Sequence, residues 1–309
     1  TLFVRFVSDF ESNYYENEIP LDISDTTAVA GLNVNTDQYR DEVWRAANDM
    51  DLELALLREL KQERNDLGIP ITDLYSADYQ PTDSVLHRIS LRGNPNLGFA
   101  KVFMIGVKGA EDLTGAERSV EVWVNELRLE GLDERGGVAA IARADVQLAD
   151  LGTITAAVNY NSIGFGALDN SVQERSREKT FGYDFAGYFN LDKFFPQEWG
   201  LRLPLYVQES RTVSTPEYDP YDFDIVLEEK LDRADPADRD SLREQTQDIT
   251  RISAINLTEV GINPQGGNQG RPAPWDIENF SLSVGQTRTQ RSDPFIASED
   301  TRESTAALD

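Results

Sequence analysis

The sequence predicts a mainly β protein: a jelly-roll-like β-sandwich unit with one helix, followed by antiparallel transmembrane β-barrel strands that form a fragment of a larger barrel. Apolar and polar residues alternate with a period of two along most of the chain, as is typical of strands with two different faces. The one strong helical period lies before residue 66. After residue 136 the alternating runs reach about 9–11 residues, the length of a strand that crosses a bilayer at a tilt.

The composition excludes several kinds of site. A chain of 309 residues is long enough for two domains, and its net charge of −26 argues against nucleic-acid binding, which needs a basic surface. The absence of cysteine excludes disulfides and thiolate metal sites, and the single histidine, His87, excludes a histidine-rich metal site. No run of about 18 apolar residues is present, so we expect no transmembrane helix, whereas barrel strands escape such a search.

The first unit, residues 1–131, is predicted to be the β-sandwich. Its helix is expected over residues 51–65, where leucines recur at helical spacing, and Gly68 is expected to end it. Strands are expected over residues 2–7, 13–21, 28–34, 85–92 and 99–107.

The segment 119–132, which reads SVEVWVNELRLEGL, has the clearest alternation of the first unit. Val122 and Val124 lie on one face of the expected strand, and Glu121 and Trp123 lie on the other. The sequence therefore predicts that this segment is the last strand of the sandwich and the hinge to the second unit.

The second unit, residues 136–309, is predicted to be a partial barrel segment of about six transmembrane strands. The strands are expected over residues 138–148, 153–160, 183–191, 201–208, 251–260 and 277–288, and the tail after residue 293 is expected to fray. In the first strand Ala144 lies on one face and Arg143 on the other, and the alanine face is expected to meet lipid because a charge there is costly. A soluble antiparallel sandwich alternates in the same way and stays an open alternative.

An acidic loop at 214–250 interrupts the second unit, with twelve acidic and four basic residues. It is predicted to be solvated and to contain two short helices, over residues 225–232 and 236–247. Asp219, Asp222 and Asp224 have the alternate spacing that can bind Ca²⁺, but the glycine and distal glutamate of an EF-hand loop are missing. A solvated turn is therefore the favoured interpretation.

No residue is assigned to chemistry. His87 is interpreted as a packing or strand-surface residue, because no nucleophile or orienting acid can be assigned to it. The pairs Glu126 with Glu130 and Asp9 with Glu11 resemble glycosidase carboxylates, but such pairs arise by chance among 55 acidic residues. We assign no catalytic, cofactor-binding or metal-binding residue, and we expect no enzymatic activity and no cofactor.

Five phrases of the sequence are similar to those of a known family. They are LFVRFVSDFESNYYENEIPL at 2–21, RGNPNLG at 92–98, SVEVWVNELRLEG at 119–131, KFFPQEWGLRLPLY at 193–206 and WDIENFSLS at 275–283. The chain thereby resembles the SprA (Sov) family, which provides the outer-membrane translocon of the type 9 secretion system in Bacteroidetes and is linked to gliding motility. The phrases lie in order over nearly the whole chain.

The resemblance implies that the chain is one segment of a much longer protein of the cell outer membrane. The implied fold is a very large single-chain β-barrel, and the implied function is a structural part of a protein-conducting channel that exports folded proteins. The implied partners are other type 9 secretion components, secreted cargo proteins with C-terminal sorting domains, and outer-membrane lipid. The alternative is a secreted carbohydrate-binding or adhesive β-sandwich module, a frequent role of jelly-roll domains; a glycosidase is the weakest alternative.

Overall fold

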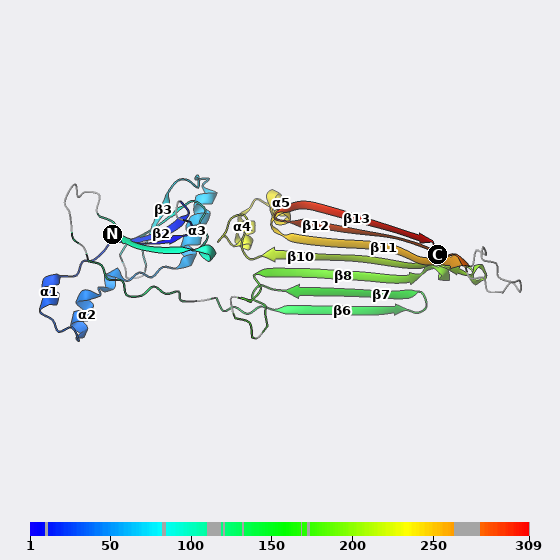
Figure 1. Ribbon diagram of the computed structural model, residues 1–309, viewed down its shortest axis with the longest axis horizontal. Helices are drawn as coiled ribbons and strands as arrows, with labels where there is room; N and C mark the ends of the chain where they lie inside the picture. The colour runs from blue at the N-terminus through cyan, green and yellow to red at the C-terminus, as the bar shows by residue number, and fades with distance from the viewer. Residues whose placement is uncertain are drawn as a thin grey trace. The chain divides into compact units, whose positions relative to one another are not determined.

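The protein is mainly β, with antiparallel sheets and few helices (Figure 1). The structure is a computed structural model of the chain, and its contacts divide the chain into two units. Unit 1 is Thr1–Arg128 with Tyr221–Val226, and unit 2 is Leu129–Pro220 with Leu227–Asp309. The structure describes residues 1–9, 12–81, 85–109, 119, 121–131, 133–167, 169–171, 174–262 and 279–308.

Unit 1 contains a five-stranded antiparallel sheet in the order β3-β4-β2-β1-β5. The strands are β1 (Leu2–Val7), β2 (Tyr14–Ile19), β3 (Tyr75–Tyr79), β4 (His87–Arg92) and β5 (Val102–Val107). Helix α3 (Leu54–Asp66) packs on one face of the sheet, because the buried side chains of Leu57 and Leu60 contact Tyr15, Ile89 and Leu91. This is the helix that the leucine spacing predicts, and Gly68, with φ of 65°, follows its end as expected.

Two segments of unit 1 differ from the prediction. The segment expected as a strand over 28–34 contains instead α1 (Thr26–Ala30), which Asp25 caps through a hydrogen bond from the Thr27 amide of 2.8 Å. A second helix, α2 (Asp37–Val43), follows it. Short 3₁₀ turns occur at Ala46–Asn48 and Leu97–Phe99.

The strand predicted over 119–132 is also wrong for the part that the structure describes. Residues 121–131 are irregular and exposed, and the side chain of Trp123 meets that of Trp44 with ring centroids 6.4 Å apart. An alternating sequence becomes a strand only where a neighbouring strand pairs with its backbone, and no described strand pairs with this segment. Among the described residues, unit 1 therefore contains one sheet.

Unit 2 is an open antiparallel sheet in the order β13-β12-β11-β10-β8-β7-β6, with the short β9 paired to β11. Its strands are β6 (Ala139–Leu148), β7 (Gly152–Asn161), β8 (Glu178–Asn190), β9 (Leu201–Arg202), β10 (Pro204–Pro216), β11 (Asp248–Ile262), β12 (Leu282–Asp293) and β13 (Ile296–Leu308). The fraying predicted after residue 293 is wrong, because β13 pairs with β12 there. An open sheet of this kind is consistent with a fragment of a larger barrel.

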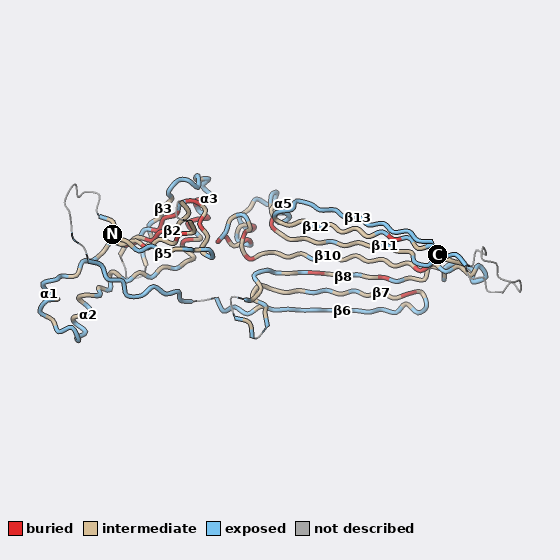
Figure 2. The backbone as a smooth tube through the Cα atoms, in the orientation of Figure 1, coloured by how far each residue is buried: buried red, intermediate tan, exposed pale blue. Residues whose placement is uncertain are grey.

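The long strands form a single layer. Figure 2 shows that most residues along β6 to β13 are intermediate or exposed, with few buried positions. Short 3₁₀ turns, Leu191–Phe194 and Gln197–Trp199, follow β8. The two helices predicted in the acidic loop are present as α4 (Leu227–Arg233) and α5 (Pro236–Thr246).

Candidate functional site: a two-faced open sheet

The register of unit 2 defines two faces of the sheet. Residues that pair directly across neighbouring strands share a face, and successive residues along a strand alternate between faces. One row of paired residues crosses the sheet: Ala144, Ala156, Phe185, Glu209, Ser253, Arg288 and Arg302. We call the face that contains this row the band face and the opposite face, which contains Arg143, the polar face.

The band face is apolar along the whole length of β6, β7 and most of β8. Its side chains there are Ala140, Ala142, Ala144, Val146, Leu148, Ile154, Ala156, Val158, Tyr160, Phe181, Tyr183, Phe185 and Phe189. The first charged residue on this face of β8 is Lys179, near the start of the strand. The predicted separation of Ala144 from Arg143 onto opposite faces is therefore present and extends to the neighbouring strands.

The later strands are apolar on the band face mainly at the end nearest the β6–β7 turn. In β10 Leu205 and Val207 precede Glu209, and in β12 Leu282 and Val284 precede the polar positions that begin at Gln286. Two apolar residues lie beyond the charged positions, Val213 and Ile249, which pair with each other. The boundary between the apolar band and the charged positions thus crosses the paired rows obliquely, while the row through Leu205, Leu257 and Val284 is apolar across the sheet.

Tilted strands account for an oblique boundary of the apolar band. Barrel strands tilt by about 35–45°, so a row perpendicular to the strands changes its depth in a bilayer from one strand to the next. The row through Phe185 begins apolar in β6 and ends at Arg288 and Arg302. A lipid layer of constant height would therefore contact such a sheet along a diagonal.

The polar face differs from the band face on every long strand of the sheet, because hydroxyl, amide and charged side chains predominate on it. Arg143 donates to Asp145 with an Nε to Oδ2 distance of 2.9 Å, and Thr155 donates to the same carboxylate at 2.7 Å. In the middle of the sheet Gln208 donates to Asp184 at 3.3 Å. A polar face of this kind suits water or protein on that side of the sheet.

Both edges of the sheet are open among the described residues. At one edge β6 pairs only with β7, and at the other β13 pairs only with β12. All the residues of β13 are exposed. Each edge presents unpaired backbone donors and acceptors that another strand can satisfy.

Unit 1 contains a buried charged cluster that the sequence does not predict. The segment Tyr221–Val226 belongs to unit 1, and its Asp224 carboxylate accepts hydrogen bonds from the Tyr15 hydroxyl at 3.0 Å and from the Leu97 amide at 2.9 Å. The buried Lys61 ammonium lies 3.3 Å from Asp222 and donates to the Pro95 carbonyl at 2.9 Å. The predicted solvated turn is therefore wrong, because these carboxylates are bonded within a folded unit.

Burial determines the titration of this cluster. Loss of water around Lys61 lowers its pKa, although the nearby Asp222 and Asp224 act in the opposite direction. Burial also raises the pKa of Tyr15, and the adjacent Asp224 adds to that effect. At neutral pH the Tyr15 hydroxyl is therefore protonated and donates a hydrogen bond to Asp224.

The carboxylates considered for a metal are not brought together. Asp219 is buried within unit 2 and pairs with Lys230, whereas Asp222 and Asp224 belong to unit 1. In the described ranges, no group of three His, Asp or Glu residues lies close enough to bind a metal ion. The three aspartates at alternate positions therefore take part in separate contacts, Asp219 within unit 2 and Asp222 and Asp224 within unit 1.

The other candidate residues occupy structural positions. His87 is buried, and its Nδ1 lies 3.0 Å from the Tyr79 hydroxyl, so the packing interpretation agrees with its surroundings. Glu126 is exposed, and its Oε2 atom lies 3.8 Å from the Nη1 atom of Arg128. Glu11 lies outside the described residues, so its pairing with Asp9 stays untested.

Two functional features escaped the sequence analysis. The strand β13 has no alternating hydrophobic pattern, and only its threonines, Thr301 and Thr305, could have indicated a strand. The segment Tyr221–Val226, which reads YDFDIV, alternates aromatic or aliphatic residues with aspartate. That pattern could have indicated an ordered, half-buried segment.

Comparison with known proteins identifies the family. No helix among the described residues is long and apolar enough to span a membrane. No curated protein matches the chain. The family model SprA_N, whose description is motility related/secretion protein, matches residues 1–231. The match covers most of the chain, and the chain therefore belongs to the SprA family of motility-related and secretion proteins.

Proposed function

We propose that this chain is a structural segment of an outer-membrane channel that conducts folded proteins in type 9 secretion and gliding motility. The observation that carries the proposal is the single-layer sheet of unit 2, whose band face is apolar along a diagonal and whose other face is polar. Such a sheet suits a barrel wall with lipid on one side and a polar lumen on the other.

The open edges support a larger assembly. A barrel wall has no free edges, so β6 and β13 need further strands beside them before this sheet can close. The secretion and motility family to which the chain belongs is consistent with such a role. In this proposal the chain contributes shape and surfaces and performs no chemistry.

The proposed partners follow from the same role. They are the other components of type 9 secretion, cargo proteins with C-terminal sorting domains, and outer-membrane lipid. Nucleic acid is not among them, because a net charge of −26 repels a polyanion.

The two faces can be tested with two neighbouring alanines of β7. Ala156 lies on the band face and Ala157 on the polar face, near the middle of the same strand. In the full-length protein in lipid bilayers, each is replaced by cysteine and spin-labelled. Electron paramagnetic resonance then measures collision with oxygen, which concentrates in lipid, and with a water-soluble nickel chelate.

The label at Ala156→Cys is expected to collide preferentially with oxygen, and the label at Ala157→Cys with the nickel chelate. Because the two variants differ by one position in the strand, each is the control for the other. Equal access of the chelate to both labels would show that the sheet stands in water, and the channel proposal would then fail.

A further inference from the structure

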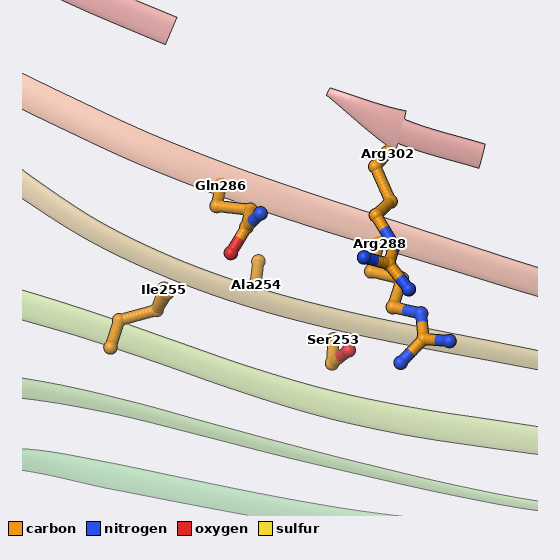
Figure 3. Close-up of a pocket in the computed structure, with 6 residues that line it drawn as sticks. All are labelled: Ser253, Ala254, Ile255, Gln286, Arg288 and Arg302. Carbon is orange, nitrogen blue, oxygen red and sulfur yellow. The ribbon is translucent and has the colours of Figure 1, made fainter. Parts of the chain in front are cut away.

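A pair of arginines stands at the polar boundary of the band face. Arg288 of β12 and Arg302 of β13 are directly opposite each other in the register. With Ser253, Ala254, Ile255 and Gln286 they line a hollow of about 240 Å³. Figure 3 shows the side chains of Arg288 and Arg302 extending together toward Ser253.

The carboxylate of Asp300 pairs with both guanidinium groups. Arg288 donates to Asp300 through two nitrogens, at 2.9 and 2.7 Å, and Arg302 lies 3.3 Å from the same Asp300 oxygen that accepts the shorter bond. Like charges directly opposite in a sheet repel each other. Two arginines and one aspartate leave a local excess of one positive charge, which an anion can neutralise.

The arginines of this sheet are concentrated on the band face. In the rows that pair β10 to β13, the band face carries Arg211, Arg251, Arg288 and Arg302 with Glu209 and Asp300, whereas the polar face carries one arginine, Arg291, with Asp248, Glu299 and Glu303. The concentration is the opposite of what the chain's net charge of −26 leads one to expect. We therefore look for a local function of the arginines on the band face.

The neighbours of the arginine pair determine which anion fits. Ile255, which is 52% exposed, lines the hollow beside the arginines, and Val284 continues the apolar band next to it. A free anion would use the guanidinium groups and leave these apolar side chains in water. A ligand with a phosphate and acyl chains would satisfy both, and arginine binds phosphate through paired hydrogen bonds.

We infer that Arg288 and Arg302, with Gln286, bind the phosphate of an outer-membrane lipid headgroup while Ile255 and Val284 contact its acyl chains. The inference rests on the proposed function, since it requires the band face to meet lipid. It adds a specific site and the chemical class of its ligand, a phosphate-bearing lipid. Basic side chains beside membrane-embedded surfaces bind anionic headgroups in this way.

The test uses the full-length protein in neutral detergent and dihexanoyl phosphatidic acid as the probe. Binding is measured by thermophoresis for the wild type and for the double variant Arg288→Gln/Arg302→Gln. The loss of two charge-assisted contacts is expected to weaken binding by about tenfold or more. The matched control is Arg291→Gln, which removes an arginine from the opposite face of the same strand and should leave the affinity unchanged.

A second variant excludes damage to the fold as the cause. Asp300→Asn removes the carboxylate that competes with the phosphate, so it is expected to tighten binding, which a misfolded protein could not do. If Asp300→Asn does not tighten binding, or if Arg291→Gln weakens it as much as the double variant does, the site is wrong.

Two further probes identify the source of the phosphate. Inorganic phosphate is expected to bind at least tenfold more weakly, and dihexanoylglycerol, which lacks phosphate, is expected not to bind.

Equal affinity for inorganic phosphate would show an anion site without lipid and would overturn the inference. The spin-label experiment on Ala156 and Ala157 is independent of these measurements, because both alanines lie on β7, near the opposite edge of the sheet from β12 and β13. Oxygen contact at Ala156 without phosphate binding would reject the headgroup site alone. The absence of oxygen contact would reject the channel proposal itself.

Discussion

His87 of unit 1 is a buried histidine that packs against a tyrosine ring. It lies in β4, pairs with Tyr79 of β3 in the register, and packs edge-on against the Tyr79 ring with centroids 5.2 Å apart. Burial lowers the pKa of His87 below its ordinary value, because the charged imidazolium would lose water. Burial also raises the pKa of Tyr79, to about 12.

The lowered pKa makes the stability of unit 1 depend on pH. The unfolded chain takes up a proton at His87 near pH 6.5, whereas the folded unit takes it up only at lower pH. The free energy of unfolding should therefore fall as the pH drops below about 6.5, by at most about 1.4 kcal/mol per pH unit. Pulse proteolysis in urea between pH 5 and 7, followed by mass spectrometry of the α3 peptide, measures this free energy of unfolding.

His87→Gln should remove this slope, because glutamine does not titrate. Arg88→Gln, at the next position of β4, keeps the histidine and should retain the slope. If the wild type and His87→Gln show the same dependence between pH 5.5 and 6.5, the histidine is not the titrating group.

At the scale of elements, the segment Tyr221–Val226 completes the core of unit 1. Asp224 satisfies the Leu97 amide and the Tyr15 hydroxyl, and Lys61 donates to the Phe223 carbonyl. Ile225, in the same segment, is buried. Unit 1 is therefore built from two separate parts of the chain.

Asp224→Ala should destabilise unit 1 by roughly 2–4 kcal/mol, since it leaves the buried Tyr15 hydroxyl and the half-buried Leu97 amide without their acceptor. The variant Asp232→Ala is the control, because Asp232 is an exposed acidic residue of the same loop. Urea unfolding of the full-length protein, followed at the α3 peptide, should show the loss for Asp224→Ala alone. Equal midpoints for the two variants would mean that the segment is solvated after all.

The elements show which parts of the fold can be predicted from the sequence. Strands β6, β7, β8 and β10 and helices α3, α4 and α5 agree with the predictions, because each has a local period or cap. The segment 121–131 has the period but no described partner strand, so its pattern misleads. Strand β13 has a partner but no hydrophobic period, because both of its faces are exposed. Pairing over long distances decides both cases.

At the scale of the whole molecule, the functional faces could be predicted only in part. The alternation in β6 places Ala144 and Arg143 on opposite faces from the sequence alone. The diagonal course of the band needs the register of the later strands, because Glu209 and Arg288 share a row with Ala144 only through a chain of pairings. A single sequence does not specify that register, so the arginine pair was not predicted.

The orientation of the sheet across the membrane is the last prediction. The 3₁₀ turns after β8 and the helix α5 lie at opposite ends of β10, because that strand runs once between them (Figure 1). In outer-membrane barrels long loops are usually extracellular, so we expect the end with α4 and α5 to face outward. Glu198 and Ser241 are exposed positions at the two ends.

Each of these residues is replaced in turn by cysteine in the full-length protein, which is then made in whole cells. An impermeant maleimide should label Ser241→Cys in intact cells and Glu198→Cys only after the outer membrane is permeabilised. Ser241→Cys is nearly isosteric, so the helix that contains it should persist. The two sites control for each other, because a single strand separates them and a strand changes sides once. Labelling of Glu198→Cys alone in intact cells would reverse the orientation. Labelling of both would show that β10 does not cross the membrane.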